Sequence, residues 1–298
     1  ERDRRGDQPD RRDGGRLVAL CRRPGDARPR HRHDRARGAA GACEGLSARD
    51  LLARLRIVQL QRPQLCLCLV HRHAAHRRGT ASEDREHFQA AREGLGHDGI
   101  LLVDTGQIFG DDVEKASQRI KAMEEANVLW FEEPFHAHAL QEYGELAKRS
   151  GKIKLAGGEG AHHPSMAKHL IDFGKVGYIQ IDCGRIGGIA PAKLVADHAV
   201  ANGVTYVNHT FTSHLALSAS LQPYAGLKNH EICEYPGQPK SLALDITKTH
   251  LKPDKNGQVK APETPGLGID INFEGLTNYL VDVSIEVNGK NLYQTPKF

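Results

Sequence analysis

Short apolar runs alternate with longer amphipathic stretches between residues 100 and 235. Each run ends in a charged or polar side chain, and the stretches between the runs place apolar residues three and four positions apart, as in a helix that packs one face on a core. Strands and helices that alternate in this way form parallel βαβ units. The predicted strands are 100–104, 128–133, 153–159, 177–182, 204–209 and 231–235, and the predicted helices are 111–126, 138–150, 163–175, 189–203 and 212–221.

The character of the runs narrows the fold class. They are continuously apolar, which indicates a sheet covered on both faces, and they recur about every 25 to 30 residues, which is typical of a (β/α)8 barrel. A dinucleotide-binding sheet is disfavoured because no GxGxxG turn follows a run. The glycine-rich 184–189 predicts a tight turn, with a phosphate-binding loop as the alternative. Since six units are visible, we predict an α/β chain with a TIM-type barrel that is incomplete at its N-terminal side.

The first 100 residues differ in composition from the rest of the chain. They hold 22 of the 25 arginines, whereas all 16 lysines lie after residue 114 and all seven tyrosines after residue 100. Three interpretations stay open for residues 1–77: a basic arm that binds nucleic acid, a solvated extension, or DNA translated in a different reading frame. The last is favoured because no helical or strand period persists there.

These observations divide the chain into three parts. Residues 1–77 are an Arg-rich segment of doubtful fold, residues 78–240 are the barrel domain, and residues 241–298 are a C-terminal tail that leaves the barrel. A helix is expected near the start of the barrel domain, with Ser82 as its N-cap. An alternating pattern around an Asn-Gly pair predicts a β-hairpin in the tail.

Cysteine usage and hydropathy limit the cellular setting. The six cysteines form no CxxC pair and no zinc-ligand spacing, which favours a reducing, cytoplasmic compartment. No apolar run approaches the ~20 residues that span a bilayer, and no signal-peptide core follows the charged N-terminus. We therefore expect no membrane association, and the net charge of +4 gives little reason to expect a nucleic-acid partner.

Three predicted strands in succession end in a carboxylate. Asp104, Glu132 and Glu159 lie 28 and 27 residues apart, which is one βα unit each. Chemistry in such barrels sits at the carboxyl ends of the strands, and three acids that meet there repel one another unless a cation neutralises them. We predict a Mg²⁺ site with these three ligands and with Glu133 as a hydrogen-bonding neighbour. The alternative is that each acid is solvated or caps the following helix.

The next strands supply candidate acid–base groups. His209 follows Asp182 by 27 residues, so a carboxylate on the adjacent strand end can orient the imidazole as a base. Glu234 lies at the end of the last run. For the histidines in the loops after strands, two roles stay open, contact with substrate and exposure to solvent. For Arg185 the two open roles are binding an anion and pairing with an acid. These loop residues are His136, His138, His162, His163 and His214.

Six motifs in this order, "LLVD", "WFEEPF", "LAGGE", "QIDCGRIGGI", "VNH" and "PGLGIDI", resemble the mandelate racemase subgroup of the enolase superfamily over residues 80–298. The resemblance implies Mg²⁺-assisted abstraction of the proton α to a carboxylate. By that resemblance, Asp104, Glu132 and Glu159 match the metal ligands and His209, oriented by Asp182, matches the general base. The resemblance also matches Glu234 to the acid that hydrogen-bonds a substrate carboxylate.

The function that this resemblance implies is dehydration of a sugar acid to a 2-keto-3-deoxy acid, in a chain expected to be a homo-oligomer. The alternatives are a racemase or epimerase of a 2-hydroxy acid and a catalytically silent metal-binding remnant. Three departures from the family matter. The family's second-strand lysines have no counterpart before Lys115, and residues 1–77 do not resemble its α+β capping domain. Gly106 stands where many relatives have asparagine.

Overall fold

The structure is a computed structural model in which the chain falls into two units by its internal contacts: 40–271, and 1–39 with 272–298. Every helix among the described residues is too short or too polar to span a membrane. The predicted boundaries after residues 77 and 240 stay predictions, and most of the Arg-rich segment lies outside the described residues. Described are 80–210, 212–228, 232–236, 239–254 and 257–296, with the backbone of 18–22, 56–59 and 66–71.

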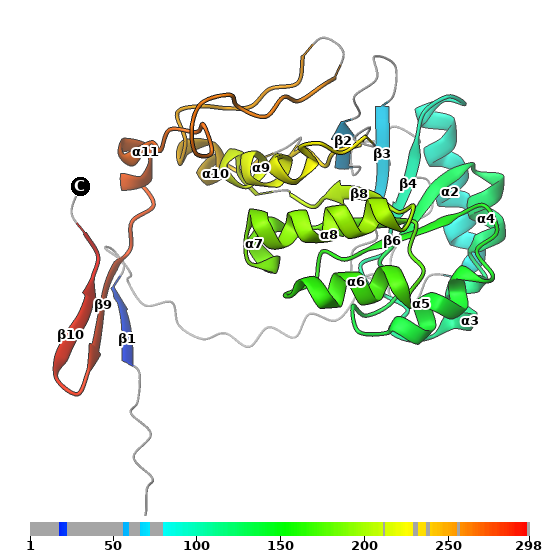
Figure 1. Ribbon diagram of the computed structural model, residues 1–298, viewed down its shortest axis with the longest axis horizontal. Coiled ribbons are helices and arrows are strands. Elements are labelled where there is room, and N and C mark those ends of the chain that lie inside the picture. The colour runs from blue at the N-terminus through cyan, green and yellow to red at the C-terminus, as the bar shows by residue number, and fades with distance from the viewer. Residues whose placement is uncertain are drawn as a thin grey trace, which may run out of the picture. The chain divides into compact units, whose positions relative to one another are not determined.

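The larger unit is built on a seven-stranded sheet whose strands follow one another in chain order (Figure 1). The first pair is antiparallel and all later neighbours are parallel. Parallel strands joined by helices confirm the predicted α/β fold, an incomplete TIM-type barrel. The strands are β2 (Arg56–Gln59), β3 (Cys66–His71), β4 (Leu101–Asp104), β5 (Val128–Glu132), β6 (Lys154–Gly157), β7 (Tyr178–Ile181) and β8 (Thr205–Asn208).

Helices follow the strands and cover one face of the sheet (Figure 1). The predicted helix over 111–126 is divided in two, because the chain turns at Gln118 and Arg119 between the two parts. The helices are α2 (Ala81–Leu95), α3 (Val113–Ser117), α4 (Ile120–Glu125), α5 (Leu140–Ala147), α6 (Pro164–Asp172), α7 (Cys183–Ile186), α8 (Ile189–Ala201) and α9 (His214–Leu221).

The two faces of the sheet have separate apolar clusters, as continuously apolar strands predict. The helix-covered face contributes the larger cluster, which joins strand residues such as Phe131 and Ile179 to the helices. The other face is the inner face of the barrel, and it carries a small cluster with four members from β4, β5, β6 and β8. This inner cluster consists of Leu102, Trp130, Ala156, Val207 and Ile232.

The helix before β4 begins two residues earlier than predicted. Its N-cap is Thr80 rather than Ser82, because Thr80 and Glu83 form a reciprocal capping box. The backbone N–H of Glu83 donates to the Thr80 hydroxyl at 3.2 Å, and the Thr80 N–H donates to the Glu83 carboxylate at 2.7 Å.

The prediction of a strand at 231–235 is wrong for its described residues, where Ile232 alone forms a β-bridge. The side chain of Asn208 explains the difference. Its Oδ1 accepts from the backbone N–H of Glu234 at 2.9 Å, and its Nδ2 donates to the Glu234 carbonyl at 3.1 Å. An amide side chain thus satisfies backbone groups that a neighbouring strand would otherwise pair.

The residues after 240 divide between the two units. Helix α10 (Ser241–Asp245) and a bridge between Thr247 and Ile271 belong to the larger unit, which reaches residue 271. The 3-10 helix η2 (Gln222–Tyr224) precedes them.

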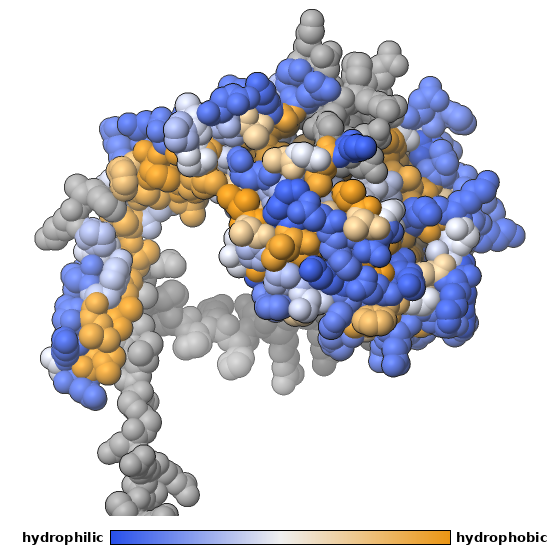
Figure 2. Space-filling view, viewed as in Figure 1, coloured by the Kyte–Doolittle hydropathy of each residue, from blue (hydrophilic) through white to orange (hydrophobic). Residues whose placement is uncertain are grey.

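The smaller unit contains the hairpin that the Asn-Gly pair predicts. Helix α11 (Phe273–Thr277) precedes β9 (Asp282–Val287) and β10 (Lys290–Gln294), which pair antiparallel. Between them Asn288 and Gly289 have φ of 51° and 73°, the conformation that a tight hairpin turn requires. β1 (Val18–Arg22) pairs with the other edge of β9. The hairpin exposes apolar side chains, among them Leu292 and Tyr293 (Figure 2).

A buried ion pair joins α2 to the α3–α4 turn. Arg119 Nε donates to Asp84 Oδ2 at 3.0 Å, and both side chains are less than 10% exposed. The guanidinium also donates to the Lys115 carbonyl at 2.8 Å and lies over the Phe109 ring. Removing one partner of a buried pair leaves a desolvated charge behind.

We therefore expect Asp84→Ala to destabilise the protein by about 3–5 kcal/mol, measured by denaturant unfolding. Glu86→Ala, on the exposed side of the same helix, is the matched control and is expected within about 0.5 kcal/mol of the wild type. Equal effects of the two substitutions would show that the buried pair adds nothing.

Candidate active site

Four predicted site residues lie at one open end of the barrel, beside its inner face, and this end is called the mouth. Asp104, Glu132, His209 and Glu234 each lie two positions after a member of the inner cluster. Residues two apart on a strand point to the same face, so Asp104, Glu132 and His209 extend the inner face beyond the strand ends. In addition, Asp104 and Glu132 are register partners on β4 and β5.

Glu159 reaches the same mouth by a different route, because it lies three positions after Ala156. The extra residue is Gly158, whose φ of 121° is a conformation that favours glycine. A Cβ there would lie 2.7 Å from Ile179 Cδ1 and 2.9 Å from the Gln180 carbonyl oxygen. The "LAGGE" motif therefore turns the end of β6 inward and brings Glu159 beside its neighbours.

Glu132 is the buried centre of the negative charge. Burial raises the pKa of Glu132 well above its usual range, and repulsion from Asp104, Glu234 and Glu159 raises it further. Trp130 Nε1 donates to Glu132 Oε2 at 3.1 Å, and the side chain of Gln180 adds a hydrogen bond. These neutral donors leave the excess of negative charge uncompensated.

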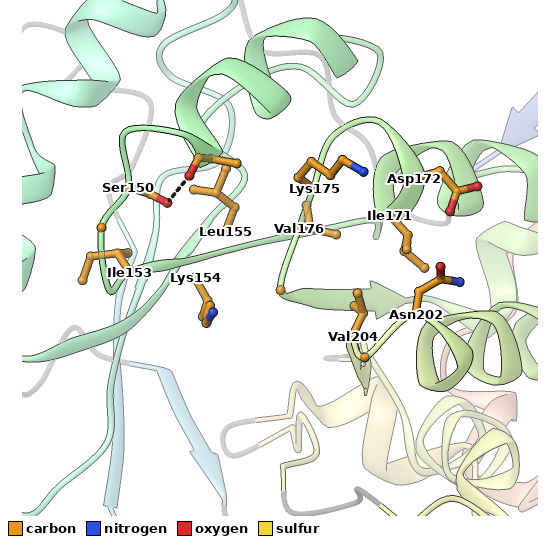
Figure 3. A pocket seen from close by; sticks show the side chains of 14 residues that line it. Ser150, Ile153, Lys154, Leu155, Ile171, Asp172, Lys175, Val176, Asn202 and Val204 are labelled. Carbon is orange, nitrogen blue, oxygen red and sulfur yellow. Dashed lines mark hydrogen bonds between the residues drawn. The ribbon is translucent and has the colours of Figure 1, made fainter.

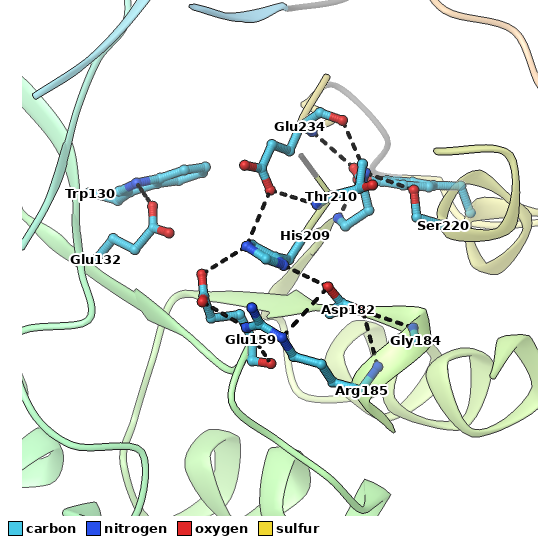
Figure 4. A network of polar contacts seen from close by, with 12 residues as sticks. Trp130, Glu132, Glu159, Asp182, Gly184, Arg185, His209, Thr210, Ser220 and Glu234 are labelled. Carbon is cyan, nitrogen blue, oxygen red and sulfur yellow. Dashed lines mark hydrogen bonds and ion pairs between the residues drawn. The ribbon is translucent and has the colours of Figure 1, made fainter. Parts of the chain in front are cut away.

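His209 and Asp182 form the pair that their spacing predicts, as Figure 4 shows. His209 Nδ1 lies 2.9 Å from Asp182 Oδ2. Asp182 is itself fixed, because its Oδ1 accepts from the backbone N–H groups of Gly184 at 2.8 Å and Arg185 at 3.0 Å and so caps α7. Burial acts against the Asp182 carboxylate, but these hydrogen bonds and His209 outweigh it and lower its pKa.

The other ring nitrogen of His209 faces carboxylates. Its Nε2 lies 3.0 Å from Glu159 Oε2 and 3.9 Å from Glu234 Oε2. Burial lowers the pKa of His209, but the hydrogen bonds to Asp182 and Glu159 and the charge of Glu234 outweigh it and raise the pKa to about 10. In this arrangement His209 is an imidazolium at neutral pH.

Arg185 pairs with an acid, which is one of the two interpretations of this residue. Its Nη1 lies 2.8 Å from Glu159 Oε1 and 3.3 Å from the Glu159 carbonyl, and its Nε is 3.9 Å from Asp182 Oδ2. Burial would raise the pKa of Glu159, but the hydrogen bonds and charges of His209 and Arg185 lower it to about 2.

Two residues that the sequence analysis missed hold Glu234 in place. The backbone N–H of Thr210 donates to Glu234 Oε2 at 2.7 Å, and Asn208 binds the Glu234 backbone. Asn208 in turn bonds to the hydroxyl groups of Tyr224 and Ser220. Sequence alone offered one signal, the "VNH" motif, in which a buried asparagine precedes the candidate base.

Glu133 is a hydrogen-bonding neighbour of the site, as predicted. Its Oε1 accepts from Gln107 Nε2 at 3.1 Å, and both residues have positive φ, 41° for Glu133 and 67° for Gln107. Burial, together with the charges of Glu159 and Asp104, raises the pKa of Glu133 to about 7. Positive φ in a non-glycine residue costs about 1–3 kcal/mol and is concentrated at functional sites.

The loop histidines that were left open have varied surroundings. His136 Nδ1 lies 3.3 Å from Gln107 Oε1, and its ring stacks on that of His138. His163 caps α6 by accepting from the Ser165 N–H, which is a structural role. His214 is buried at the start of α9. His162 is exposed, and no contact of its side chain indicates a role.

The donor set fits a hard divalent cation by its chemistry: three strand-end carboxylates, with buried Gln180 Oε1 left without a hydrogen-bond partner. Whether these groups lie close enough together to bind one ion is a separate question. In the described part of the chain, no three His, Cys, Asp or Glu side chains are gathered so that they could hold a metal ion. Both oxygens of Glu159 have positive neighbours, Arg185 at one and His209 at the other.

A cavity of about 570 Å³ lies at the opposite, amino ends of β6, β7 and β8 (Figure 3). Its polar lining includes Lys154, Lys175, Asp172 and Asn202. None of the predicted site residues lines it, so it is distinct from the carboxylate mouth.

The pKa of His209 leads to a prediction for protein treated with a chelator. A raised pKa adds stability that is fully present below about pH 6.5 and is lost as the pH rises towards about 10. We expect the unfolding free energy of wild type to exceed that of His209→Gln at low pH, and this difference to decrease as the pH rises from about 6.5 to about 10. By NMR the imidazole should titrate near pH 10. An imidazole midpoint at or below pH 6.5 would contradict the ion-paired arrangement.

The chain is similar to curated enzymes. D-galactarolactone cycloisomerase of Agrobacterium fabrum is 29% identical over 66% of this chain and 53% of its own length. L-talarate/galactarate dehydratase of Salmonella typhimurium is 32% identical over 48% of this chain and 36% of its own length. The chain spans about half the length of the first of these curated relatives.

Solved structures and a family match agree with these relatives. A structure described as a predicted mandelate racemase from Rhodobacter sphaeroides is 55% identical, with a TM-score of 0.73, over 78% of this chain and 59% of that one. The 3,6-anhydro-D-galactonate cycloisomerase from Zobellia galactanivorans is 26% identical, with a TM-score of 0.64, over 72% and 58%. The "Enolase C-terminal domain-like" family matches residues 66–275. The chain belongs to this family.

Proposed function

We propose that this protein is a Mg²⁺-dependent lyase that removes the proton α to the carboxylate of a sugar acid and eliminates water to give a 2-keto-3-deoxy acid. One observation carries the proposal: a His–Asp pair faces a buried cluster of carboxylates at the strand ends. The names of the relatives support the substrate class, because they act on galactarate, talarate and related sugar acids or lactones.

Asp104, Glu132 and Glu159 are the residues that would hold the cation. When bound, Mg²⁺ would act as a Lewis acid and stabilise the negative charge that develops on the substrate carboxylate as the α proton leaves. The carboxylates suit this task because their mutual repulsion is relieved by a cation.

His209 would carry the proton. Asp182 holds Nδ1 and fixes the tautomer, so Nε2 is the atom directed into the mouth. Nε2 accepts the α proton and the C–H electron pair forms the new carbon–carbon double bond. The β-hydroxyl takes the C–O electron pair and leaves as water after receiving the proton from the same nitrogen, and the resulting enol tautomerises to the 2-keto-3-deoxy acid. Glu234, held by Thr210, would hydrogen-bond a substrate carboxylate oxygen.

Nε2 accepts a proton only when it is unprotonated and free of Glu159. Given the contact at 3.0 Å and the pKa of about 10, His209 would have to leave this ion pair before acting as a base. Binding of a cation to Glu159 would remove the partner that holds the proton on Nε2.

The alternatives make different demands on the chain. A racemase or epimerase needs a second base on the opposite face of the substrate. The family's second-strand lysines have no counterpart in this sequence, whose first lysine is Lys115. A silent remnant needs the metal site alone. The cytoplasmic setting and the homo-oligomeric state remain predictions beside this proposal.

We expect His209→Asn to abolish dehydration, by at least about 10³-fold, since it removes the proton carrier. Turnover of a panel of sugar acids is followed by detecting 2-keto-3-deoxy products, and His97→Asn, on a side chain 97% exposed, is the control. Unchanged turnover in His209→Asn would overturn the assignment of the base, and metal binding without turnover in the wild type would favour the silent remnant.

We expect Glu132→Gln to weaken Mg²⁺ binding by about tenfold or more in calorimetric titration, because it removes a charged ligand. The same change should raise the melting temperature of chelator-treated protein, because a buried carboxyl among like charges is lost. Glu86→Gln is the control for both measurements. Unchanged Mg²⁺ affinity in Glu132→Gln would remove this residue from the ligand set.

A further inference from the structure

His214 is a buried titratable group that the proposed reaction does not use. It is the first residue of α9 and only 3% exposed, and its Nδ1 is buried without a hydrogen-bond partner. An imidazolium carries a proton on both ring nitrogens, so protonation would leave a buried N–H donor with no acceptor. The surroundings of His214 therefore suit the neutral ring.

The ring of His250 packs on that of His214. The two rings stack, with centroids 4.8 Å apart and an angle of 24° between their planes. His250 Nε2 lies 2.9 Å from the Leu244 carbonyl, and because a carbonyl only accepts, this nitrogen carries a proton in the neutral ring as well as in the charged one. His250 thus keeps its hydrogen bond when it gains a charge, and a charged ring can remain stacked on His214.

The neighbours of His214 oppose a positive charge on it. Among the described residues, the charges that act on His214 are those of His250 and Lys252, and the titratable Tyr235 turns its ring towards it with 6.4 Å between centroids. Burial, followed by the charges of His250 and Lys252, lowers the pKa of His214. The position at the first turn of α9 acts in the same direction, because the N-terminus of a helix disfavours a cation.

Residues 246–252, called the covering segment here, pack on α9 through His250 and Leu251. Leu251 lies against an apolar cluster built on α9. Its carbonyl accepts a hydrogen bond of 2.9 Å from the Tyr235 hydroxyl. Since Tyr235 directly follows Glu234, the covering segment is tied to the part of the chain that brings Glu234 to the mouth.

We propose that His214 and His250 form a pH-sensitive contact, which holds the covering segment on α9 while His214 is neutral and loosens it when His214 takes up a proton. Protonation turns the stack into a contact between like charges and leaves a buried donor unpaired. Loosening also weakens the Tyr235 hydrogen bond beside Glu234. The contact responds to acid whether or not the protein catalyses the proposed reaction, because neither ring takes part in it.

The direction of the pH effect follows from proton linkage. Because the folded protein lowers the pKa of His214, the open chain binds the proton more readily than the closed one. The stabilising contribution is therefore fully present above about pH 6.5 and is lost as the pH falls below it.

Hydrogen exchange of the full chain tests the contact at one amide. The backbone N–H of Lys248, in the covering segment, donates to the Asp270 carbonyl at 2.9 Å, so its exchange reports opening of the segment. We expect its protection factor to fall about fivefold or more between about pH 7.5 and about pH 5 in wild type. In His214→Phe, which keeps a flat ring that cannot be charged, the fall should be less than about twofold.

The matched control is His97→Phe, on a side chain 97% exposed, which should behave like wild type. Glu133, with a pKa of about 7, also changes charge in this range, and the comparison of wild type with His214→Phe removes its contribution.

A second readout follows the His214 imidazole by NMR. Its titration midpoint in wild type should lie below pH 6.5. His250→Phe should raise this midpoint, because it removes a positive neighbour and keeps a stacked ring. His250→Glu should raise it further, above pH 6.5, because a carboxylate then takes the place of a cation. A merely structural role of the stack would lower the melting temperature without ordering the midpoints in this way.

Loss of Lys248 protection on acidification in wild type but not in His214→Phe supports the contact, and so does the expected order of midpoints. Equal loss in wild type and His214→Phe, or protection that does not change with pH, overturns it. A wild-type midpoint at or above pH 6.5, or the same midpoint in wild type and His250→Phe, overturns it as well. The two His250 variants decide the question if His214→Phe fails to fold, since they leave the residues of α9 unchanged.

Discussion

Repulsion among buried carboxylates is the constraint on which this site depends. Asp104, Glu159 and Glu234 all act on Glu132, which is nearly inaccessible to solvent. Desolvated like charges are tolerated only with protons or positive partners nearby. Among the described residues, the imidazolium of His209 and the guanidinium of Arg185 are two such partners, and both contact Glu159.

The barrel explains how so many charges come together. Alternation along each strand carries the inner face of the sheet to Asp104, Glu132 and His209 without any special geometry. Glu159 needs the conformation of Gly158 to join them, and Glu234 needs a backbone held by Asn208 because its segment is not a strand. Regular structure places the first three, and individual side chains or glycines place the last two.

The same charges hold His209 in one pairing. With His209 bound to Glu159, the imidazole holds its proton and cannot serve as a base. A cation on Glu159 would exchange one positive partner for another while freeing Nε2. Glu133 and Gln107, whose backbones have positive φ, are joined by a hydrogen bond next to these acids.

The sequence by itself determined much of this protein. Apolar runs one βα unit apart predicted the parallel strands, and the acids that end them predicted the carboxylate mouth and the His209–Asp182 pair, because strand ends in a barrel share one edge. The Asn-Gly pair predicted the hairpin of the smaller unit. These features follow from local chemistry and from a period that the chain repeats.

Only the tertiary structure decided the pairing of charges and the identity of the caps. Thr80 replaced Ser82 as an N-cap because Glu83 completes a reciprocal pair, and Asn208 replaced a strand partner for residue 234. The choice of Arg185 for Glu159 depends on how far α7 turns back over the end of β6, which no spacing in the sequence encodes. Contacts between residues distant in the chain, and the burial that strengthens them, are properties of the fold.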